Sequence, residues 1–466
     1  MRVTNIKSQE IYSSMRIDGS YHLSHAVIFE RSIEEREYVP LYHLTDRIFT
    51  AGRSKRMYTQ KERGLPYLSN SDVIAQNPFQ NCKYNSKKYG YDENAFIKEG
   101  MILTGRVGAI AQTAYATREF EEKQAMGSDN IIRIVTKCSK GSGFLYAFLN
   151  SKIGRTLLWK LATGGVQPYI TEDMIASIPV PIFSSHKQEE IHNLIVEAAE
   201  LRVEANQLLE EAERNLVEKL KITIEDNNLF ASSEKKTKNI YSLQRNDLST
   251  LTFRGRNYSP RKQNILAKLK SNSYDRLIDV LERPPFYGSR FKRIEASKGN
   301  IELLSQGDIF DYKPKGRMIS SRNIANLNEE IVKKGTILIP AQGTLGENEI
   351  FGHAKFVWGY LENKLIAGHA MRFIPNTALI REGYLFAVLS SNMWFRLLRN
   401  SVYGTNLLGF IIPMINEYPI PRFEKEFEEE IDASVKNAYE KHTTAIDKEY
   451  QAIQLIEKEI ESWQQS

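Results

Sequence analysis

The clearest hydrophobic pattern in the chain is a long stripe of apolar residues between positions 185 and 225. Apolar side chains recur there at alternating spacings of three and four residues, with polar and mostly acidic residues between them. The residues of the stripe are Ile191, Leu194, Ala198, Leu201, Ala205, Leu208 and Ala212. Such spacing is typical of a helix that packs along another helix as a coiled coil. The stripe therefore predicts a long helix with an alanine-rich, closely approaching face.

A second stripe of this kind runs through positions 423–466. Its members are Tyr439, His442, Ile446, Ile453, Ile456, Ile460 and Trp463, and Glu449 interrupts the series. A helix of about 35 residues extends roughly 50 Å at about 1.5 Å per residue and is only marginally stable alone. We therefore expect the two helices to pack against each other, with two independent surface helices as the alternative. The candidate helix-pairing residues are Ile191, Leu194, Ala198, Leu201, Leu208, Ile446, Ile453, Ile456 and Ile460.

The segments before each stripe have short apolar runs and glycine-rich turns, with few long periodic stretches. The passages 96–103 and 331–338 each place a Lys-x-Gly turn before an apolar run, which predicts a hairpin entering a core. Amphipathic helices are expected at roughly 143–162 and 383–402. This mixture indicates α+β domains.

The sequence pattern of this region occurs twice in the chain, and the second copy follows the first by 240 positions. The stretch Gly-Phe-Leu-Tyr-Ala-Phe-Leu-Asn-Ser at 143–151 returns as Gly-Tyr-Leu-Phe-Ala-Val-Leu-Ser-Ser at 383–391. The same shift maps Gly164 onto Gly404, and the pair Pro179 and Pro181 onto Pro419 and Pro421. A solenoid repeat is only about 20 to 50 residues long, so this is a duplicated domain. Each copy ends in a Pro-x-Pro segment. A helix interior does not tolerate this segment, so it marks a boundary.

These observations predict the fold class and the domain boundaries. We expect an α+β protein in which two duplicated mixed α/β domains are separated by two long α-helices. The expected segments are a first domain over 1–184, a first long helix over 185–225, a linker over 226–240, a second domain over 241–422 and a second long helix over 423–466. Two copies about a pseudo-twofold axis suit duplex DNA, which has matching approximate symmetry.

The composition is that of a folded, soluble protein, and the two cysteines lead us to expect the cytoplasm. Of the 466 residues, 41% are hydrophobic and 26% charged, which is ample for two buried cores. No run of about 18 apolar residues is present, so we expect no membrane span, and the first residues contain no signal-peptide core. Cys82 and Cys138 lack metal-ligand spacing and are expected to be free thiols in a reducing compartment.

The overall charge of +6 conceals an alternation along the chain. Residues 1–184 carry a net charge of +6, residues 185–230 carry −6, residues 231–422 carry +13 and residues 423–466 carry −7. Two basic blocks therefore alternate with two acidic helical blocks. The basic blocks can meet phosphate, and the acidic ones are expected to stay away from it.

The sequence contains no recognisable motif for catalysis. Arg283-Pro284-Pro285-Phe286 has the prolines of an amino-methyltransferase motif, but a guanidinium stands where an acceptor is required. The segments Gly105–Gly108 and Pro340–Gly343 are too short for a phosphate-binding loop and are interpreted as turns. The eight histidines do not cluster as metal ligands. We expect no catalytic activity, no metal and no cofactor in this chain.

Basic clusters interleaved with aromatic residues occur at related places in the two copies. The segment 52–61 and the segment 288–293 are both glycine-led, basic and close to an aromatic residue. Further clusters lie at 83–88 and at 312–323. Lys and Arg side chains that contact phosphates fix the position of a protein on the duplex. Hydrogen-bond donors and acceptors on short loops then recognise the bases in the groove. The candidate DNA-binding residues are Arg53, Lys55, Arg56, Lys61, Lys87, Lys88, Arg290, Lys292, Arg293, Lys315, Arg317 and Arg322.

An ordered set of further motifs occurs in both copies. One is the run Gly-Gly-Val-Gln-Pro-Tyr-Ile-Thr-Glu-Asp-Met-Ile-Ala-Ser-Ile-Pro-Val-Pro at 164–181, followed by Gln-Glu-Glu-Ile and a long helix, and another is Leu-Ser-Asn-Ser-Asp at 68–72 with Leu-Ser-Gln-Gly-Asp at 304–308. This set resembles the specificity subunits of Type I restriction-modification systems, in which the first run looks like the end of a target-recognition domain. The resemblance covers nearly the whole chain and occurs twice in the same order. In the second copy, Gly-Thr-Asn-Leu-Leu at 404–408 replaces the Gly-Gly-Val-Gln-Pro turn.

The resemblance implies a function and a set of partners. Each globular copy would be a target-recognition domain that reads one half of a bipartite, asymmetric sequence in double-stranded DNA. The two long helices would form an antiparallel coiled coil that docks two methyltransferase subunits, which would carry S-adenosylmethionine. Motor-nuclease subunits would join for restriction in phage defence. The alternatives are a recognition subunit of another DNA methyltransferase or phage-defence complex, and a helical scaffold that does not bind DNA.

Overall fold

The chain folds into two units with separate cores. The computed structural model describes residues 5–88, 92–108, 110–223, 241–245, 248–296 and 300–463. Unit 1 comprises Met1–Val203 with Thr444–Ser466, and unit 2 comprises Glu204–Thr443. The predicted linker, 226–240, lies outside the described residues. Among the described residues, no helix is both long and apolar enough to cross a bilayer.

Unit 1 combines short helices with two four-stranded sheets. Its helices are α1 (Ser8–Ser14), α2 (Gly19–His22), α3 (Ala26–Glu34), α4 (Leu41–Leu44), α5 (Asn70–Val73), α6 (Arg118–Glu122), α7 (Ser142–Asn150), α8 (Lys152–Leu161) and α9 (Glu172–Ala176). Its strands are β1 (Tyr38–Pro40), β2 (Thr45–Thr50), β3 (Tyr58–Thr59), β4 (Gly64–Leu68), β5 (Lys83–Ser86), β6 (Ile102–Gly105), β7 (Thr113–Tyr115), β8 (Met126–Gly127), β9 (Ile131–Thr136) and β10 (Pro179–Pro181). The sheets have the strand orders β2-β9-β6-β7 and β3-β5-β4-β8.

Unit 2 has the same kinds of element in a similar order. Its helices are α12 (Pro260–Lys270), α13 (Leu327–Glu330), α14 (Glu382–Ser390), α15 (Asn392–Arg399) and α16 (Ile412–Asn416). Its strands are β11 (Tyr274–Arg276), β12 (Ile301–Leu304), β13 (Arg317–Ile319), β14 (Ile337–Pro340), β15 (Gln342–Gly343), β16 (Lys355–Phe356), β17 (Leu365–Ile366), β18 (Ala370–Phe373), β19 (Val402–Tyr403), β20 (Leu408–Phe410) and β21 (Pro419–Pro421). Three-stranded sheets form in the orders β16-β14-β18, β13-β12-β17 and β15-β20-β19.

Corresponding strand pairs recur in the two units. Each Pro-x-Pro segment is a short strand paired antiparallel with an early strand, β10 with β1 and β21 with β11. Each unit also contains one parallel pair, β4 with β8 and β12 with β17. The predicted Lys-x-Gly turns precede β6 and β14, and their glycines, Gly100 and Gly335, have φ of +76° and +82°. Only glycine adopts this conformation without steric cost, which explains its place in both turns.

The amphipathic segments at 143–162 and 383–402 are each two helices and not one. Ser151 is extended, with φ −63° and ψ 161°, and its hydroxyl accepts from Gly154 N at 3.0 Å. Ser391 has φ −62° and ψ 152° and accepts from Trp394 N at 3.4 Å. A serine in this conformation caps a new helix. Helices therefore occupy both predicted segments, and a serine divides each segment in two.

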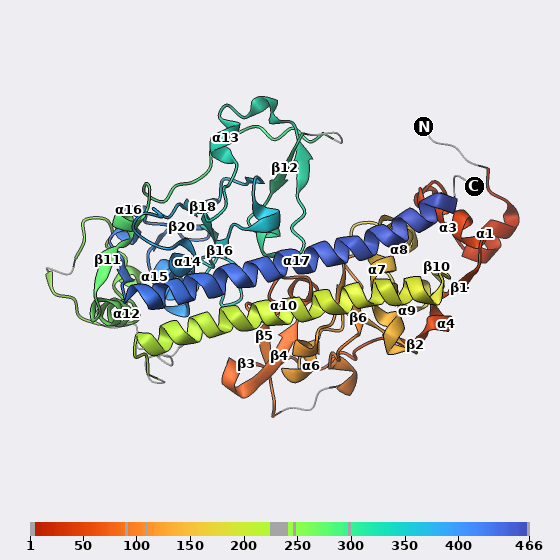
Figure 1. The fold of residues 1–466 in the computed structure, drawn as a ribbon, viewed down its shortest axis with the longest axis horizontal. Coiled ribbons are helices and arrows are strands. Elements are labelled where there is room, and N and C mark those ends of the chain that lie inside the picture. Colours follow the sequence, from red (N-terminus) through yellow and green to blue (C-terminus); the bar gives the residue numbers. More distant parts are fainter. Residues whose placement is uncertain are drawn as a thin grey trace. The chain divides into compact units, whose positions relative to one another are not determined.

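The two long helices are α10 (Ser185–Lys219) and α17 (Lys425–Trp463), and parts of both belong to each unit. In unit 1, ion pairs join Lys187 to Glu459 and Lys448 Nζ to Glu197 Oε2, the latter at 2.5 Å. As the residue number rises on α10 it falls on α17, so these helix segments run antiparallel (Figure 1). Ile191 and Ile195 share a core cluster there with α17 residues, namely Ala452, Ile453, Ile456 and Ile460.

The helix segments in unit 2 are paired in the same sense. Lys441 Nζ contacts Glu204 Oε2 at 2.6 Å, and Lys219 pairs with Glu424. The core of this unit includes Leu216 together with three residues of α17, which are Ile431, Val435 and Tyr439. α10 ends at Lys219, earlier than the predicted 225, and Lys221 has a φ of +52°. This left-handed residue stops the helix.

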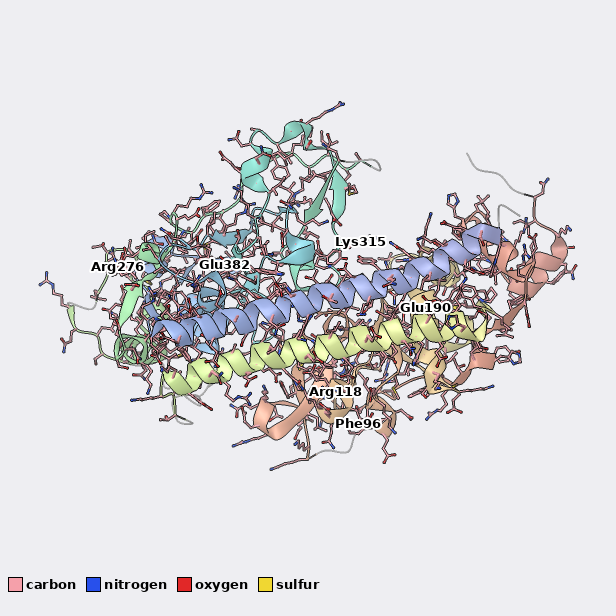
Figure 2. All side chains as sticks on the ribbon, in the orientation of Figure 1. Phe96, Arg118, Glu190, Arg276, Lys315 and Glu382 are labelled. Carbon is pink, nitrogen blue, oxygen red and sulfur yellow. The ribbon has the colours of Figure 1, made fainter. Side chains whose placement is uncertain are left out.

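Each unit attaches a short helix to the long helix that follows its Pro-x-Pro strand. Gly143 N at the start of α7 donates to His192 Nδ1 at 3.1 Å. Gly383 N at the start of α14 donates to Asp432 Oδ1 at 2.8 Å. In unit 1, Arg118 of α6, labelled in Figure 2, also contacts Glu200 of α10 at 3.2 Å. The long helices are therefore integral parts of both units.

Candidate nucleic-acid interface

In unit 1, one sheet brings together two of the basic segments that the sequence singles out. β3 pairs with β5, with Tyr58 opposite Asn85. The side chain of Asn85 is buried and its Oδ1 accepts from Met57 N at 2.8 Å. Arg53, Lys55 and Arg56 lie between β2 and β3, Lys61 follows β3, and Lys87 and Lys88 follow β5. The segments 52–61 and 83–88, separate in sequence, therefore form one basic edge of the β3-β5-β4-β8 sheet.

Unit 2 joins its basic segments in the same way. Residues 294–296 lie beside β13, where Ser320 N donates to Ile294 O at 2.9 Å and Glu295 bridges Ile319. β13 pairs with β12 in turn. Arg290, Lys292 and Arg293 precede this edge, Lys315 joins β12 to β13, Arg317 is in β13 and Arg322 follows it. Lys315 is labelled in Figure 2.

All twelve predicted DNA-binding residues are exposed, but they differ in how their charge is balanced. Arg53 and Arg56 both contact Asp129, at 3.5 Å and 2.5 Å, and Arg317 contacts Glu295 at 2.9 Å. The other nine form no ion pair with any residue that the structure describes: Lys55, Lys61, Lys87, Lys88, Arg290, Lys292, Arg293, Lys315 and Arg322. Unneutralised cations of this kind attract an external anion most strongly.

Each unit contains a buried arginine that joins segments distant in sequence. In β9, Arg133 donates from Nη2 to Gly127 O at 2.6 Å and to Ala95 O at 3.0 Å. In β18, Arg372 donates from Nη2 to Glu330 O at 2.9 Å and contacts Glu330 Oε2 at 3.1 Å. Burial lowers the pKa of Arg133 to about 10, so it remains protonated at neutral pH. Sequence reasoning did not single out either arginine, because each sits in an apolar strand without a local motif.

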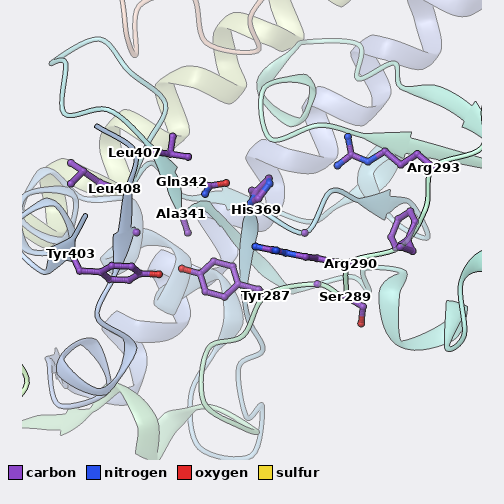
Figure 3. Close-up of a pocket in the computed structure, with 14 residues that line it drawn as sticks. Tyr287, Ser289, Arg290, Arg293, Ala341, Gln342, His369, Tyr403, Leu407 and Leu408 are labelled. Carbon is purple, nitrogen blue, oxygen red and sulfur yellow. The ribbon is translucent and has the colours of Figure 1, made fainter. Parts of the chain in front are cut away.

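Unit 2 contains a cavity of about 920 Å³ beside its basic edge (Figure 3). Three separate segments line it, at 287–293, 341–342 and 403–409, together with Gly368 and His369. The hydroxyl groups of Tyr287 and Tyr403 point toward each other, and the side chain of Arg290 reaches toward His369. Of the predicted residues, Arg290 and Arg293 line the cavity. Gln342, His369, Tyr287 and Tyr403 were missed, since no local pattern marks them.

The cavity walls are held by β-pairing and by a buried ion pair. β15 pairs with β20, with Gln342 opposite Gly409, and β19 pairs with β20. The segment Pro340–Gly343, interpreted as a turn from the sequence, therefore contributes a strand. Ser289 N donates to Glu330 Oε1 at 3.0 Å, which ties the 287–293 segment to the Glu330–Arg372 pair. Burial raises the pKa of Tyr287, and the neighbouring Tyr403 adds to the rise.

The predicted helix-pairing residues do not all lie at the centre of the pairing. Ile191, Ala198, Ile446, Ile453, Ile456 and Ile460 are buried, whereas Leu194, Leu201 and Leu208 are half-buried. Ile195, Ala199 and Val203 are buried as well and were missed. Glu449, which interrupts the stripe, is buried and accepts from Tyr146 Oη at 2.8 Å. The buried stripe is wider than a two-helix contact because α7 also packs on α10.

Among the described residues, no group of three or more His, Cys, Asp or Glu has the arrangement of a metal site. Cys82 is buried and Cys138 exposed, and both are free thiols. Burial raises the pKa of Cys82 to about 11, which keeps it a thiol at neutral pH. The described residues thus offer charge and hydrogen-bonding groups at the two basic edges, together with the cavity.

Comparison with known proteins gives matches among solved structures. No protein-family profile and no curated protein matches the chain. It is similar to a Type I restriction-modification S subunit from M. genitalium, with 12% identity over 91% of this chain and 94% of that one and a TM-score of 0.34. It is also similar to the HsdS subunit from Thermoanaerobacter tengcongensis, with 13% identity, 91% and 95% coverage and a TM-score of 0.25.

A third similar structure comes from work on complex assembly and conformational transition of the type I restriction-modification system. It has 11% identity, coverage of 91% of this chain and 97% of that one, and a TM-score of 0.28. These three solved structures, each similar to nearly the whole chain, come from Type I restriction-modification systems.

Proposed function

We propose that this protein is the DNA sequence-specificity subunit of a Type I restriction-modification complex. The two units are duplicated target-recognition domains, and each binds one half of a bipartite site in double-stranded DNA. α10 and α17 form an antiparallel coiled coil that docks two methyltransferase subunits, and motor-nuclease subunits join for restriction. The chain itself is non-catalytic and holds no cofactor, while S-adenosylmethionine binds the partner methyltransferase.

The observation that carries the proposal is the repetition of one basic sheet edge in both units. In unit 1 the segments 52–61 and 83–88 meet through the β3–β5 pair, and in unit 2 residues 294–296, which follow the segment 288–293, lie beside β13 of the segment 312–323. Each of the two sheets contains a parallel strand pair. Lys87 and Lys88 in unit 1, and Lys292 and Lys315 in unit 2, are exposed and have no ion pair among the described residues. A solvated surface accounts for one such edge. Its recurrence at equivalent places favours a repeated anionic partner, and duplex DNA is one.

The half-sites are expected to differ, because equivalent positions carry different side chains. Arg106 N donates to Asn130 O at 2.8 Å in unit 1, and Ala341 N donates to His369 O at 2.9 Å in unit 2. This shared backbone contact makes Asn130 equivalent to His369, and Val107 equivalent to Gln342. An apolar valine and an amide read different base edges. The proposed DNA site is therefore asymmetric.

The test is to purify the tagged full-length chain from its host and identify the proteins bound to it. Binding to duplex DNA is then measured, and methylated adenines are mapped across the genome with and without the chain. We expect a methyltransferase to co-purify and a bipartite adenine motif to lose methylation when the chain is deleted. A chain with partners but without DNA binding would be a scaffold. Loss of a continuous motif would indicate another kind of methyltransferase complex.

A further inference from the structure

We propose that the cavity of unit 2 receives base edges from the major groove of duplex DNA. In this proposal Gln342 contacts an adenine and Arg290 contacts a guanine of the same half-site. The inference rests on the proposed function and goes further, since it names the base-selecting residues and the bases. The walls of the cavity are fixed before any DNA arrives.

The backbone around the cavity is held from several sides. Gln342 O accepts from Gln306 Nε2 at 2.9 Å, and Ala341 N donates to His369 O at 2.9 Å. A Cβ on Gly368 would lie 2.9 Å from Gly288 O, so the 287–293 segment and the 368–369 segment approach closely as backbones. Groups that select a base must be positioned within a fraction of an ångström, and such a frame provides that.

The side chains in the cavity have unused hydrogen-bonding capacity. Within the part of the chain that the structure describes, the side chains of Arg290, Gln342 and His369 make no hydrogen bond or ion pair. Arg290 and His369 are exposed and Gln342 is half-buried. Polar groups left unpaired in a concave site are those that a ligand can satisfy.

The chemistry of these groups matches base edges. A guanidinium donates two parallel hydrogen bonds to guanine O6 and N7, and a carboxamide pairs in two places with adenine N6 and N7. Both patterns are presented in the major groove, which is wide enough to admit a protein edge. The aromatic residues Tyr287, Phe291 and Tyr403 add apolar surface on which a thymine methyl can pack.

The surroundings of the cavity favour a duplex over a small nucleotide. Tyr403 and Leu407 are 56% and 59% exposed, so this side of the cavity is open to a large partner. Lys292, exposed and adjacent to Arg293 of the cavity wall, is in place to contact a phosphate. Phosphate contacts next to a base-reading surface are the usual arrangement at a protein–DNA interface.

The experiment selects bound duplexes from a randomised pool and sequences them. It uses the full-length tagged chain purified with its bound proteins, and compares wild type with Gln342→Val, which installs the residue of the equivalent position in unit 1. We expect Gln342→Val to lose an adenine preference at one position of one half-site by roughly tenfold or more, and Arg290→Ala to lose a guanine in that same half. The control is Lys270→Ala, an exposed lysine of α12 away from the cavity, which should select the wild-type motif.

A second variant at Gln342 distinguishes a lost base contact from a loss of folding. Gln342→Glu keeps the shape of the side chain but replaces the amide by an acceptor, so we expect the preference to move from adenine toward cytosine. If all three variants select the wild-type motif unchanged, the inference is overturned while the proposed function stands. If the wild-type protein selects no motif, the proposed function fails and the inference fails with it.

Discussion

Gly143 and Gly383 allow α7 and α14 to lie directly against the long helices. A Cβ on Gly143 would be 2.8 Å from His192 O, and a Cβ on Gly383 would be 2.8 Å from Asp432 Oδ1. These separations are shorter than a van der Waals contact. The sequence repeat contains both glycines, and the structure gives the physical reason: any side chain there would push the short helix away from the long one.

Gly143→Ala should therefore destabilise unit 1. We expect a loss of about 1 to 3 kcal/mol in the free energy of unfolding, the usual cost of overpacking a well-packed contact. Denaturant titration followed by circular dichroism measures it. Gly165→Ala is the matched control, because a Cβ there would meet nothing within 4 Å. Equal stability of the two variants would contradict the close approach.

His353 couples the stability of unit 2 to acid pH. Its ring stacks on Phe395 at a centroid distance of 4.1 Å, and burial lowers its pKa to about 3, with Arg399 and Arg396 contributing. An unfolded histidine takes up a proton below a pKa of about 6.5, while the folded one does so only near pH 3. Stability from this group is thus present above pH 6.5 and falls as the pH drops from about 6.5 toward 3.

The substitution His353→Phe keeps an aromatic ring for the stack and removes the titration. Between about pH 6 and pH 4, the unfolding free energy of the wild type should fall by up to about 1.4 kcal/mol per pH unit more steeply than that of the variant. Urea titrations at a series of pH values measure the two slopes. Parallel slopes would show that His353 is protonated in the folded protein.

At the scale of elements, the long helices were the easiest to predict and the cavity the hardest. Three- and four-residue spacing sustained through many turns leaves few alternatives to a helix, so α10 and α17 lie where the stripes predict. The breaks at Ser151 and Ser391 were missed, because an N-cap serine within an apolar run looks like a polar position of one helix. Gln342 and His369 were missed for another reason: strand pairing brings them together over a long sequence separation.

Apolar contacts, rather than ion pairs, should hold α17 to α10. Ile456 is fully buried in the core of unit 1, so Ile456→Ala should cost about 2 to 5 kcal/mol. Lys448→Ala should lower the free energy of unfolding by about 1 kcal/mol or less, because the ion pair of Lys448 with Glu197 is partly exposed. Gln454→Ala on the exposed face of α17 is the control. Chemical denaturation measures both losses. If Lys448→Ala were more destabilising than Ile456→Ala, apolar contacts would not be what holds the two helices together.

At the scale of the whole molecule, the charge is arranged by segment. The basic blocks at 1–184 and 231–422 carry +6 and +13, and the acidic blocks at 185–230 and 423–466 carry −6 and −7. The structure also shows which of the basic side chains already form an ion pair with a carboxylate. Arg53 and Arg56 share Asp129, whereas Lys87, Lys88 and Lys292 have no ion pair among the described residues. Sequence alone gives the net charge of a segment but cannot separate these two groups.

This difference predicts how the proposed DNA binding depends on salt. Each phosphate contact contributes a slope of about −0.9 in a plot of log affinity against log salt concentration. The double variant Lys87→Ala/Lys88→Ala in unit 1 and the single variant Lys292→Ala in unit 2 should each make the slope shallower, and the combined variant should change it by the sum. Arg56→Ala should change the slope less, because Asp129 already neutralises part of that charge.

Fluorescence anisotropy with a fixed duplex at several salt concentrations measures these slopes. If Arg56→Ala had the largest effect, or if the two units' contributions were not additive, the two basic edges would not be separate contacts with one DNA molecule.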